Sequence, residues 1–83
     1  MPSPAEDLVF GAIRRNVLIV VDDLDPDTVT IDRALPDLGC NSVDRTEIVS
    51  MTMEDLDIVV PVTEFGAVND IRSLVEVLTR HLP

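Results

Sequence analysis

The chain lacks several features that define common classes of protein. It has one cysteine, Cys40, and so can form no intramolecular disulfide and offers no zinc-site spacing. Basic residues are also scarce: six oppose sixteen acidic ones, and the formal net charge of -10 repels phosphate backbones and anionic lipid headgroups. We therefore expect no nucleic acid and no membrane as a partner, and a reducing cytoplasm as the compartment.

Long apolar runs and a secretory signal are missing as well. No apolar stretch approaches the length of a membrane span, and residues 1–7 lack the basic and apolar regions of a signal peptide. Aromatic residues make up only 2% of the chain, so a core must be built from Val, Leu, Ile and Met. A chain of 83 residues is enough for one small domain, and we expect residues 1–83 to form it as a monomer.

A catalytic constellation is absent too. The sole histidine, His81, lies near the C-terminus, and the segment around Ser42 lacks the second glycine of a nucleophile elbow. These two features argue against a serine hydrolase, and we expect no catalytic residue. His81 is interpreted as a favourable charge at the end of a helix.

Acidic residues in the first half of the chain briefly suggest a calcium-binding loop. Asp23, Asp25 and Asp27 alternate as calcium ligands do, but Thr28 replaces the required glycine and Ala34 the final glutamate. We therefore expect no metal site and interpret these side chains as solvated.

The first predicted helix begins at Ser3 or Pro4 and ends near Val21. Acidic residues in its first turn agree with the helix dipole. Its core-facing stripe is predicted to consist of Phe10, Ile13, Val17, Val20 and Leu24. The β-branched run over residues 17–21 also fits a buried strand, which periodicity alone does not exclude.

A second helix is predicted from about Val43 to Leu56, with Asn41 or Ser42 as its N-cap. It would direct Ile48, Thr52 and Leu56 toward the core. Asn69 or Asp70 would cap a last helix. Its apolar stripe comprises Ile71, Leu74, Val75, Leu78 and Leu82.

The connections between these helices differ in character. Residues 22–41 are acidic, contain Pro26 and Pro36, and predict a long loop pinned to the core by Ile31, Leu35 and Leu38, with a short helix near 32–35 left open. Residues 58–62 predict an extended connector and residues 63–67 a brief helical turn. The expected fold is therefore all-α, a small bundle of three main helices plus a short fourth, with a long first loop.

Ser42 is the residue to which we assign the chemistry. It follows the turn Leu38-Gly39 and stands where a helix begins, and a helix N-terminus favours an anion such as phosphate. A serine in this place is commonly only an N-cap. Because the chain has no other reactive constellation, we predict that another enzyme modifies Ser42 and that this chain carries the added group.

The segment Asp37-Leu38-Gly39-Cys40-Asn41-Ser42-Val43-Asp44, followed by Glu47-Ile48-Val49, resembles the modification site of acyl carrier proteins. The usual family core is Asp-Ser-Leu, whereas Asn41 and Val43 flank the serine here. The order of loop, turn, helix, connector and final helix follows the family over nearly the whole chain. The resemblance implies that a phosphopantetheinyl transferase uses coenzyme A and magnesium to join 4'-phosphopantetheine to Ser42 through a phosphodiester.

Residues 41–45, Asn-Ser-Val-Asp-Arg, and the connector over residues 60–65 are similar to a narrower group of carriers. These are free-standing donor carriers of polyketide β-branching cassettes. The similarity implies an acetyl cargo, delivery to an HMG-CoA synthase-like enzyme, and acyl-loading or decarboxylating ketosynthase-type enzymes as further partners. A general acyl carrier of polyketide or fatty acid synthesis is the alternative.

The second helix would also carry the surface that visiting enzymes touch, because it adjoins Ser42. Its acidic character favours partners with basic docking surfaces. The expected docking residues are Asn41, Val43, Asp44, Arg45, Glu47, Met51, Glu54 and Asp55. An ordinary solvated helix face is the alternative for these residues, and an unmodified adaptor that binds a basic protein is the alternative for the chain.

Overall fold

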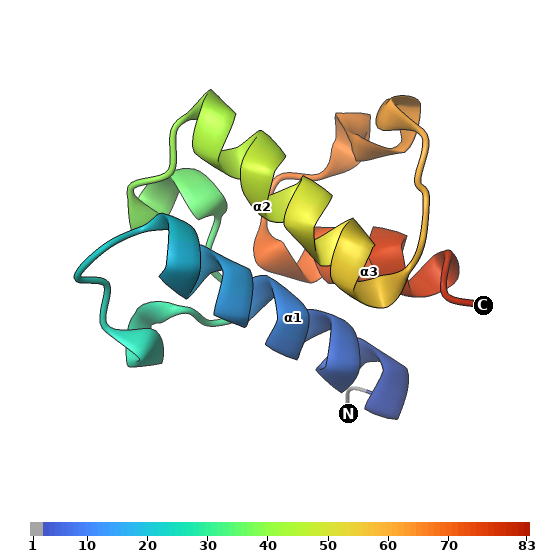
Figure 1. Ribbon diagram of the computed structural model, residues 1–83, viewed down its shortest axis with the longest axis horizontal. Helices are drawn as coiled ribbons and strands as arrows, with labels where there is room; N and C mark the ends of the chain where they lie inside the picture. The colour runs from blue at the N-terminus through green and yellow to red at the C-terminus, as the bar shows by residue number, and fades with distance from the viewer. Residues whose placement is uncertain (1–2) are drawn as a thin grey trace.

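The computed structural model describes residues 3–83, so the first two residues of the N-terminal segment lie outside it. It contains three α-helices, which are α1 (Pro4–Val20), α2 (Ser42–Leu56) and α3 (Ile71–Arg80). α1 and α2 lie side by side and run in opposite directions (Figure 1). None of the helices formed by residues 3–83 is long and apolar enough to cross a bilayer.

Short 3-10 helices punctuate the connections. η1 (Pro26–Thr28) and η2 (Leu35–Leu38) lie in the first loop, and η3 (Val62–Ala67) lies between α2 and α3. The predicted all-α bundle with three main helices is thereby confirmed, with η3 as the short fourth. The first loop does contain a short helix, which the sequence had left open near residues 32–35. This helix is η2, and it begins at Leu35.

α1 begins with a reciprocal cap and stays helical through its β-branched end. Ser3 Oγ accepts a hydrogen bond from the Glu6 N–H, and Glu6 Oε1 accepts one from the Ser3 N–H, both at 3.2 Å. The helix continues to Val20, so the alternative of a strand over residues 17–21 is wrong. Tertiary packing of a long amphipathic face outweighs the modest helix propensity of valine and isoleucine here.

The buried face of α1 is rotated slightly from the predicted stripe. Its fully buried apolar side chains are Val9, Ile13 and Val17, while Phe10 and Val20 are only half-buried and Leu24 lies beyond the helix end. The prediction missed this rotation because the face includes a polar residue, Asn16, which an apolar stripe cannot contain.

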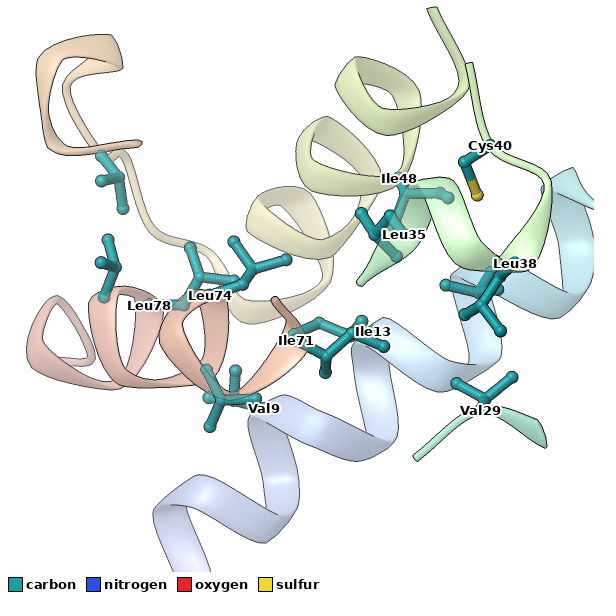
Figure 2. Packing of buried hydrophobic residues seen from close by; sticks show 14 of the residues in the cluster. Val9, Ile13, Val29, Leu35, Leu38, Cys40, Ile48, Ile71, Leu74 and Leu78 are labelled. Atoms are coloured by element: carbon teal, nitrogen blue, oxygen red, sulfur yellow. The ribbon is translucent and has the colours of Figure 1, made fainter. Parts of the chain in front are cut away.

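The core lies between the three helices and is closed by the first loop. It has side chains from every α-helix and from the loop, as Figure 2 shows for Val9, Ile13, Val29, Leu35, Leu38, Cys40, Ile48, Ile71, Leu74 and Leu78. The expected anchors Leu35 and Leu38 are buried and Ile31 is half-buried. Each large aliphatic side chain buried in this way contributes about 1.5–3 kcal/mol of transfer free energy.

The first loop is also bonded to the start of α3. The N–H groups of Ile71 and Arg72 donate to the carbonyl oxygens of Arg33 (2.8 Å) and Ile31 (2.9 Å). These bonds satisfy N–H groups that a helix N-terminus would otherwise leave free. Asp70 is the N-cap of α3, because its Oδ1 accepts a bond from the Ser73 N–H at 2.8 Å.

The apolar stripe of α3 is confirmed apart from its last member. Leu82 is half-buried and lies beyond the helix, which ends at Arg80. His81 forms the C-cap, as expected of a residue at the helix end, but its Nε2 also lies 2.6 Å from Glu64 Oε2. This contact joins the end of α3 to η3.

A buried polar contact joins α1 to α2. Asn16 is 2% exposed, and its Nδ2 donates to Thr52 Oγ1 at 2.9 Å and to Asp55 Oδ2 at 3.0 Å. Thr52 Oγ1 in turn donates to the Ile48 carbonyl oxygen at 2.8 Å. Because a buried amide must be hydrogen-bonded, this contact fixes how the two helices are rotated against each other.

We expect Asn16→Ala to lower the free energy of unfolding by about 2–3 kcal/mol, because it breaks both bonds and leaves a small cavity. Urea titration checks this through the midpoint at an unchanged m-value. The matched variant Asn69→Ala changes an exposed asparagine and should cost much less. Equal losses for the two variants would contradict the role given to Asn16.

Candidate functional site

The site lies at the start of α2, where the chain leaves the first loop. η2 ends at Leu38 and is followed by its C-cap Gly39, whose φ of 89° places it in the left-handed region that glycine adopts without strain. Cys40 then returns to the core at 6% exposure, as expected of a packing residue. The turn therefore delivers the next residues to the surface directly from a buried anchor.

Asn41, rather than Ser42, is the N-cap of α2. Asn41 Oδ1 accepts from the Asp44 N–H at 2.8 Å, and Asp44 Oδ2 accepts from the Asn41 N–H at 3.2 Å. α2 consequently starts one residue earlier than predicted, with Ser42 as its first helical residue. The Ser42 hydroxyl is exposed and is not used to cap the helix.

Two further contacts surround Ser42. Arg45 Nη2 donates to Ser42 Oγ at 3.3 Å, and the Thr46 hydroxyl donates to the Ser42 carbonyl oxygen at 3.0 Å. The Arg45 contact was not predicted, although its spacing of three residues on a helix could have revealed it. Among the described residues, the N–H groups of Ser42 and Val43 find no acceptor, so the positive end of the helix dipole is open to solvent here.

An apolar hollow of about 420 Å³ begins beside Ser42 and runs along α2 toward η3. Its walls are mainly aliphatic, and its polar members are Ser42, Arg45, Thr46 and Ser50. The lining residues are Leu35, Ser42, Arg45, Thr46, Val49, Ser50, Met53, Val60, Val62, Phe65, Val68 and Leu74. This hollow was not predicted. In the connector Ile58 and Val60 are buried and Val59 between them is exposed, an alternation that stops before Val62, which is 85% exposed.

A second hollow of about 540 Å³ lies on the outer face of α2 and also includes Ser42. It is bordered by two carboxylates, and its lining residues are Ser42, Val43, Thr46, Glu47, Ser50, Met51 and Glu54. Four of the predicted docking residues therefore share one exposed face with the serine.

The remaining predicted docking residues are placed differently. Asn41 and Asp44 are engaged in the cap, and Arg45 lies on the side of the apolar hollow. Asp55 faces α1, where its Oδ2 accepts from Asn16 and lies 3.5 Å from Arg15 Nη2. Asp55 thus belongs to the contact between the helices and lies apart from the outer face.

Cys40 is the other nucleophilic side chain near the site. Burial, and to a lesser extent the negative charge of Asp44, raises the pKa of its thiol, while Arg45 acts in the opposite direction. At neutral pH the buried thiol stays protonated and is a poor nucleophile. Among residues 3–83, no three His, Cys, Asp or Glu side chains converge as metal ligands would.

Comparison with known proteins agrees with this arrangement. A family model described as "Phosphopantetheine attachment site" matches residues 15–78. The chain therefore belongs to the phosphopantetheine-binding family of acyl carrier proteins, as the resemblance predicted, and its prosthetic group is covalently attached 4'-phosphopantetheine.

Among individual proteins, the chain is similar to the polyketide biosynthesis acyl-carrier-protein AcpK of Bacillus subtilis (strain 168). The two are 37% identical over 70 residues, which cover 84% of this chain and 85% of that protein. No solved structure matches the chain at a comparable level of significance.

The capping geometry predicts that two neighbouring substitutions change the stability by unequal amounts. Asn41→Ala should lower the free energy of unfolding by about 1 kcal/mol, the usual cost of losing an N-cap, whereas Ser42→Ala should change it by less than about 0.5 kcal/mol. Chemical denaturation of the apo form measures both. A larger loss in Ser42→Ala than in Asn41→Ala would show that the serine is the cap.

Proposed function

We propose that Ser42 Oγ is the point at which 4'-phosphopantetheine is attached, and that the chain carries an acyl group on this arm for the enzymes of a polyketide pathway. The observation that carries the proposal is that Asn41 caps α2, which leaves the Ser42 hydroxyl exposed and not needed for capping. The similarity to a carrier named for polyketide biosynthesis supports the choice of pathway.

The residues around Ser42 fit the arm. The free N–H groups of Ser42 and Val43 and the Arg45 guanidinium suit a phosphodiester, and the apolar hollow can shelter the uncharged part of the arm. When bound, the group supplies a thiol that holds an acyl unit as a thioester. The chain itself contributes the attachment point, the surface that partners recognise, and a neutral Cys40 thiol that does not compete for the acyl group.

Attachment needs no base within this chain. Ser42 Oγ gains a bond to phosphorus as the anhydride bond of coenzyme A breaks, so the nucleotide half of coenzyme A leaves and the serine proton passes to the transferase. His81 cannot serve as that base, because the end of α3, which it caps, lies far from the start of α2 (Figure 1). A phosphopantetheinyl transferase is therefore the first partner.

Incubation with coenzyme A, magnesium and a broad-specificity transferase should add the mass of one phosphopantetheine to the wild-type chain. Ser42→Ala should abolish the addition with its helical content intact, as circular dichroism would show. Ser50→Ala removes another exposed serine of α2 and should label fully. Labelling of Ser42→Ala would place the attachment elsewhere, and an unlabelled wild type would favour the unmodified adaptor.

We further propose that the cargo is acetyl and that the recipient is an HMG-CoA synthase-like enzyme, which uses it in β-branching. The motif Asn-Ser-Val-Asp-Arg at residues 41–45 supports this donor role. The docking surface would consist of the outer face of α2, namely Val43, Glu47, Met51 and Glu54, together with the rim residue Arg45. The same proposal includes an acyl-loading or decarboxylating ketosynthase-type enzyme as a further partner. It also holds that the carrier is a monomer and is located in the cytoplasm.

Acetyl transfer from the loaded chain to a purified cassette synthase tests this role. Glu47→Lys should lower the specificity constant by about three- to tenfold at low ionic strength and less at high salt, because salt screens exposed charges. The same reversal at Glu76, an exposed position on α3, is the matched control and should have little effect.

An ordinary elongation carrier in place of this chain should react more slowly with the synthase. Equal rates for the two carriers would instead support a general acyl carrier. A Glu47→Lys effect that does not change with salt would remove the electrostatic basis of the docking surface.

A further inference from the structure

Ser42 lines two hollows that are both mainly apolar but carry charged residues of opposite sign, so a group attached to its hydroxyl could extend into either one. On one side is the apolar hollow, whose rim carries Arg45. On the other side is the outer hollow, whose rim carries Glu47 and Glu54. A negatively charged phosphodiester at Ser42 Oγ would be attracted to the first rim and repelled by the second.

Arg45 differs from the arginines that stabilise the fold. Arg15 and Arg72 pair with carboxylates, and Arg14 donates to the Pro26 carbonyl oxygen. Among residues 3–83 Arg45 has no acidic partner within ion-pair distance, and its Nη2 donates to Ser42 Oγ instead. A cation in a chain of charge -10 is thus held against a neutral hydroxyl.

The acidic neighbours of Arg45 are occupied elsewhere. Asp44, the adjacent residue, accepts from the Asn41 N–H within the capping box. Glu47 and Glu54 lie on the outer rim of α2, while Arg45 lines the opposite hollow. The guanidinium is therefore available to a new anion at the serine without first breaking an ion pair of the fold.

We propose that Arg45 is a positioning residue, whose guanidinium binds the phosphodiester formed on Ser42 Oγ and directs the arm along the apolar hollow. This inference rests on the attachment proposed above. Esterification removes the serine proton and places charged oxygens beside the guanidinium, so a weak contact with a hydroxyl becomes a charge-assisted one. The planar fork of arginine suits phosphate better than the compact ammonium of lysine.

The contact is exposed to solvent, so its effect should be moderate and sensitive to salt. An exposed charge pair of this kind changes an equilibrium by roughly two- to fivefold at low ionic strength. We therefore expect Arg45 to bias where the arm rests, while leaving it free to swing into a partner enzyme.

The test compares wild-type, Arg45→Gln, Arg45→Lys and Arg80→Gln chains after complete loading, which intact mass must establish first. Arg80→Gln is the matched control, because it removes the same charge at the end of α3, which lies far from the start of α2 (Figure 1). The readouts are the ³¹P resonance of the phosphodiester and the methyl resonances of Val49, Met53 and Val62 in apo and loaded forms.

Loading of the wild type should shift the methyl resonances of the apolar hollow. Arg45→Gln should move the ³¹P resonance and reduce the methyl shifts by about two- to fivefold, Arg45→Lys should restore part of them, and Arg80→Gln should match the wild type. These differences should fade as salt rises.

The two proposals fail in different ways. If the wild type acquires no mass, the attachment at Ser42 is wrong and the role of Arg45 falls with it. If every variant loads but Arg45→Gln and the wild type give the same ³¹P and methyl resonances, the attachment stands and the positioning role is overturned.

Discussion

The reciprocal bonds between Asn41 and Asp44 are the constraint on which the site depends. A helix must satisfy its first N–H groups, and in many helices a serine or threonine hydroxyl does so. Here the asparagine takes that role, and the acidic side chain three residues later closes the box. The serine between them is therefore held in helical geometry as an exposed residue whose hydroxyl is not needed for the cap.

Much of this structure could be predicted from sequence, and the failures have physical causes. The helices and the loop anchors follow from local patterns of apolar residues, caps and turns, while attachment at Ser42 stays a prediction. The choice between Asn41 and Ser42 as cap did not follow, because both side chains cap well and only the three-dimensional bonds decide. The contact of Asp55 with Asn16 was not predicted, since an exposed acid and an acid bonded to a buried amide on another helix look alike in sequence.

The residues of α2 that line the two hollows form regular stripes in the sequence, which the prediction did not use. Ser42, Thr46, Val49 and Met53 recur at spacings of three and four and form one stripe of α2, which borders the apolar hollow. A neighbouring stripe, which consists of Val43, Glu47, Met51 and Glu54, borders the outer hollow. What the sequence could not show was the far wall of the apolar hollow, which Val60 of the connector and Val62 and Phe65 of η3 supply.

The buried contact of Asn16 matters for the site because it determines how α2 is rotated about its axis, and hence where the two stripes lie. Neighbouring residues of an α-helix are about 100° apart around its axis, so a rotation of α2 by that amount would bring the stripe of Val43 and Glu47 to the place now taken by that of Ser42 and Thr46. Apolar packing alone resists such a rotation weakly, because Ile48 could be replaced at the core by other aliphatic neighbours. The bonds from Asn16 to Thr52 and Asp55 tolerate no such exchange, since a rotated helix would leave the amide buried and unpaired. The contact of Asn16 with Thr52 and Asp55 thereby determines which residues of α2 line each of the two hollows at Ser42. Asp55, which was expected to dock a partner, helps to hold α2 in this orientation.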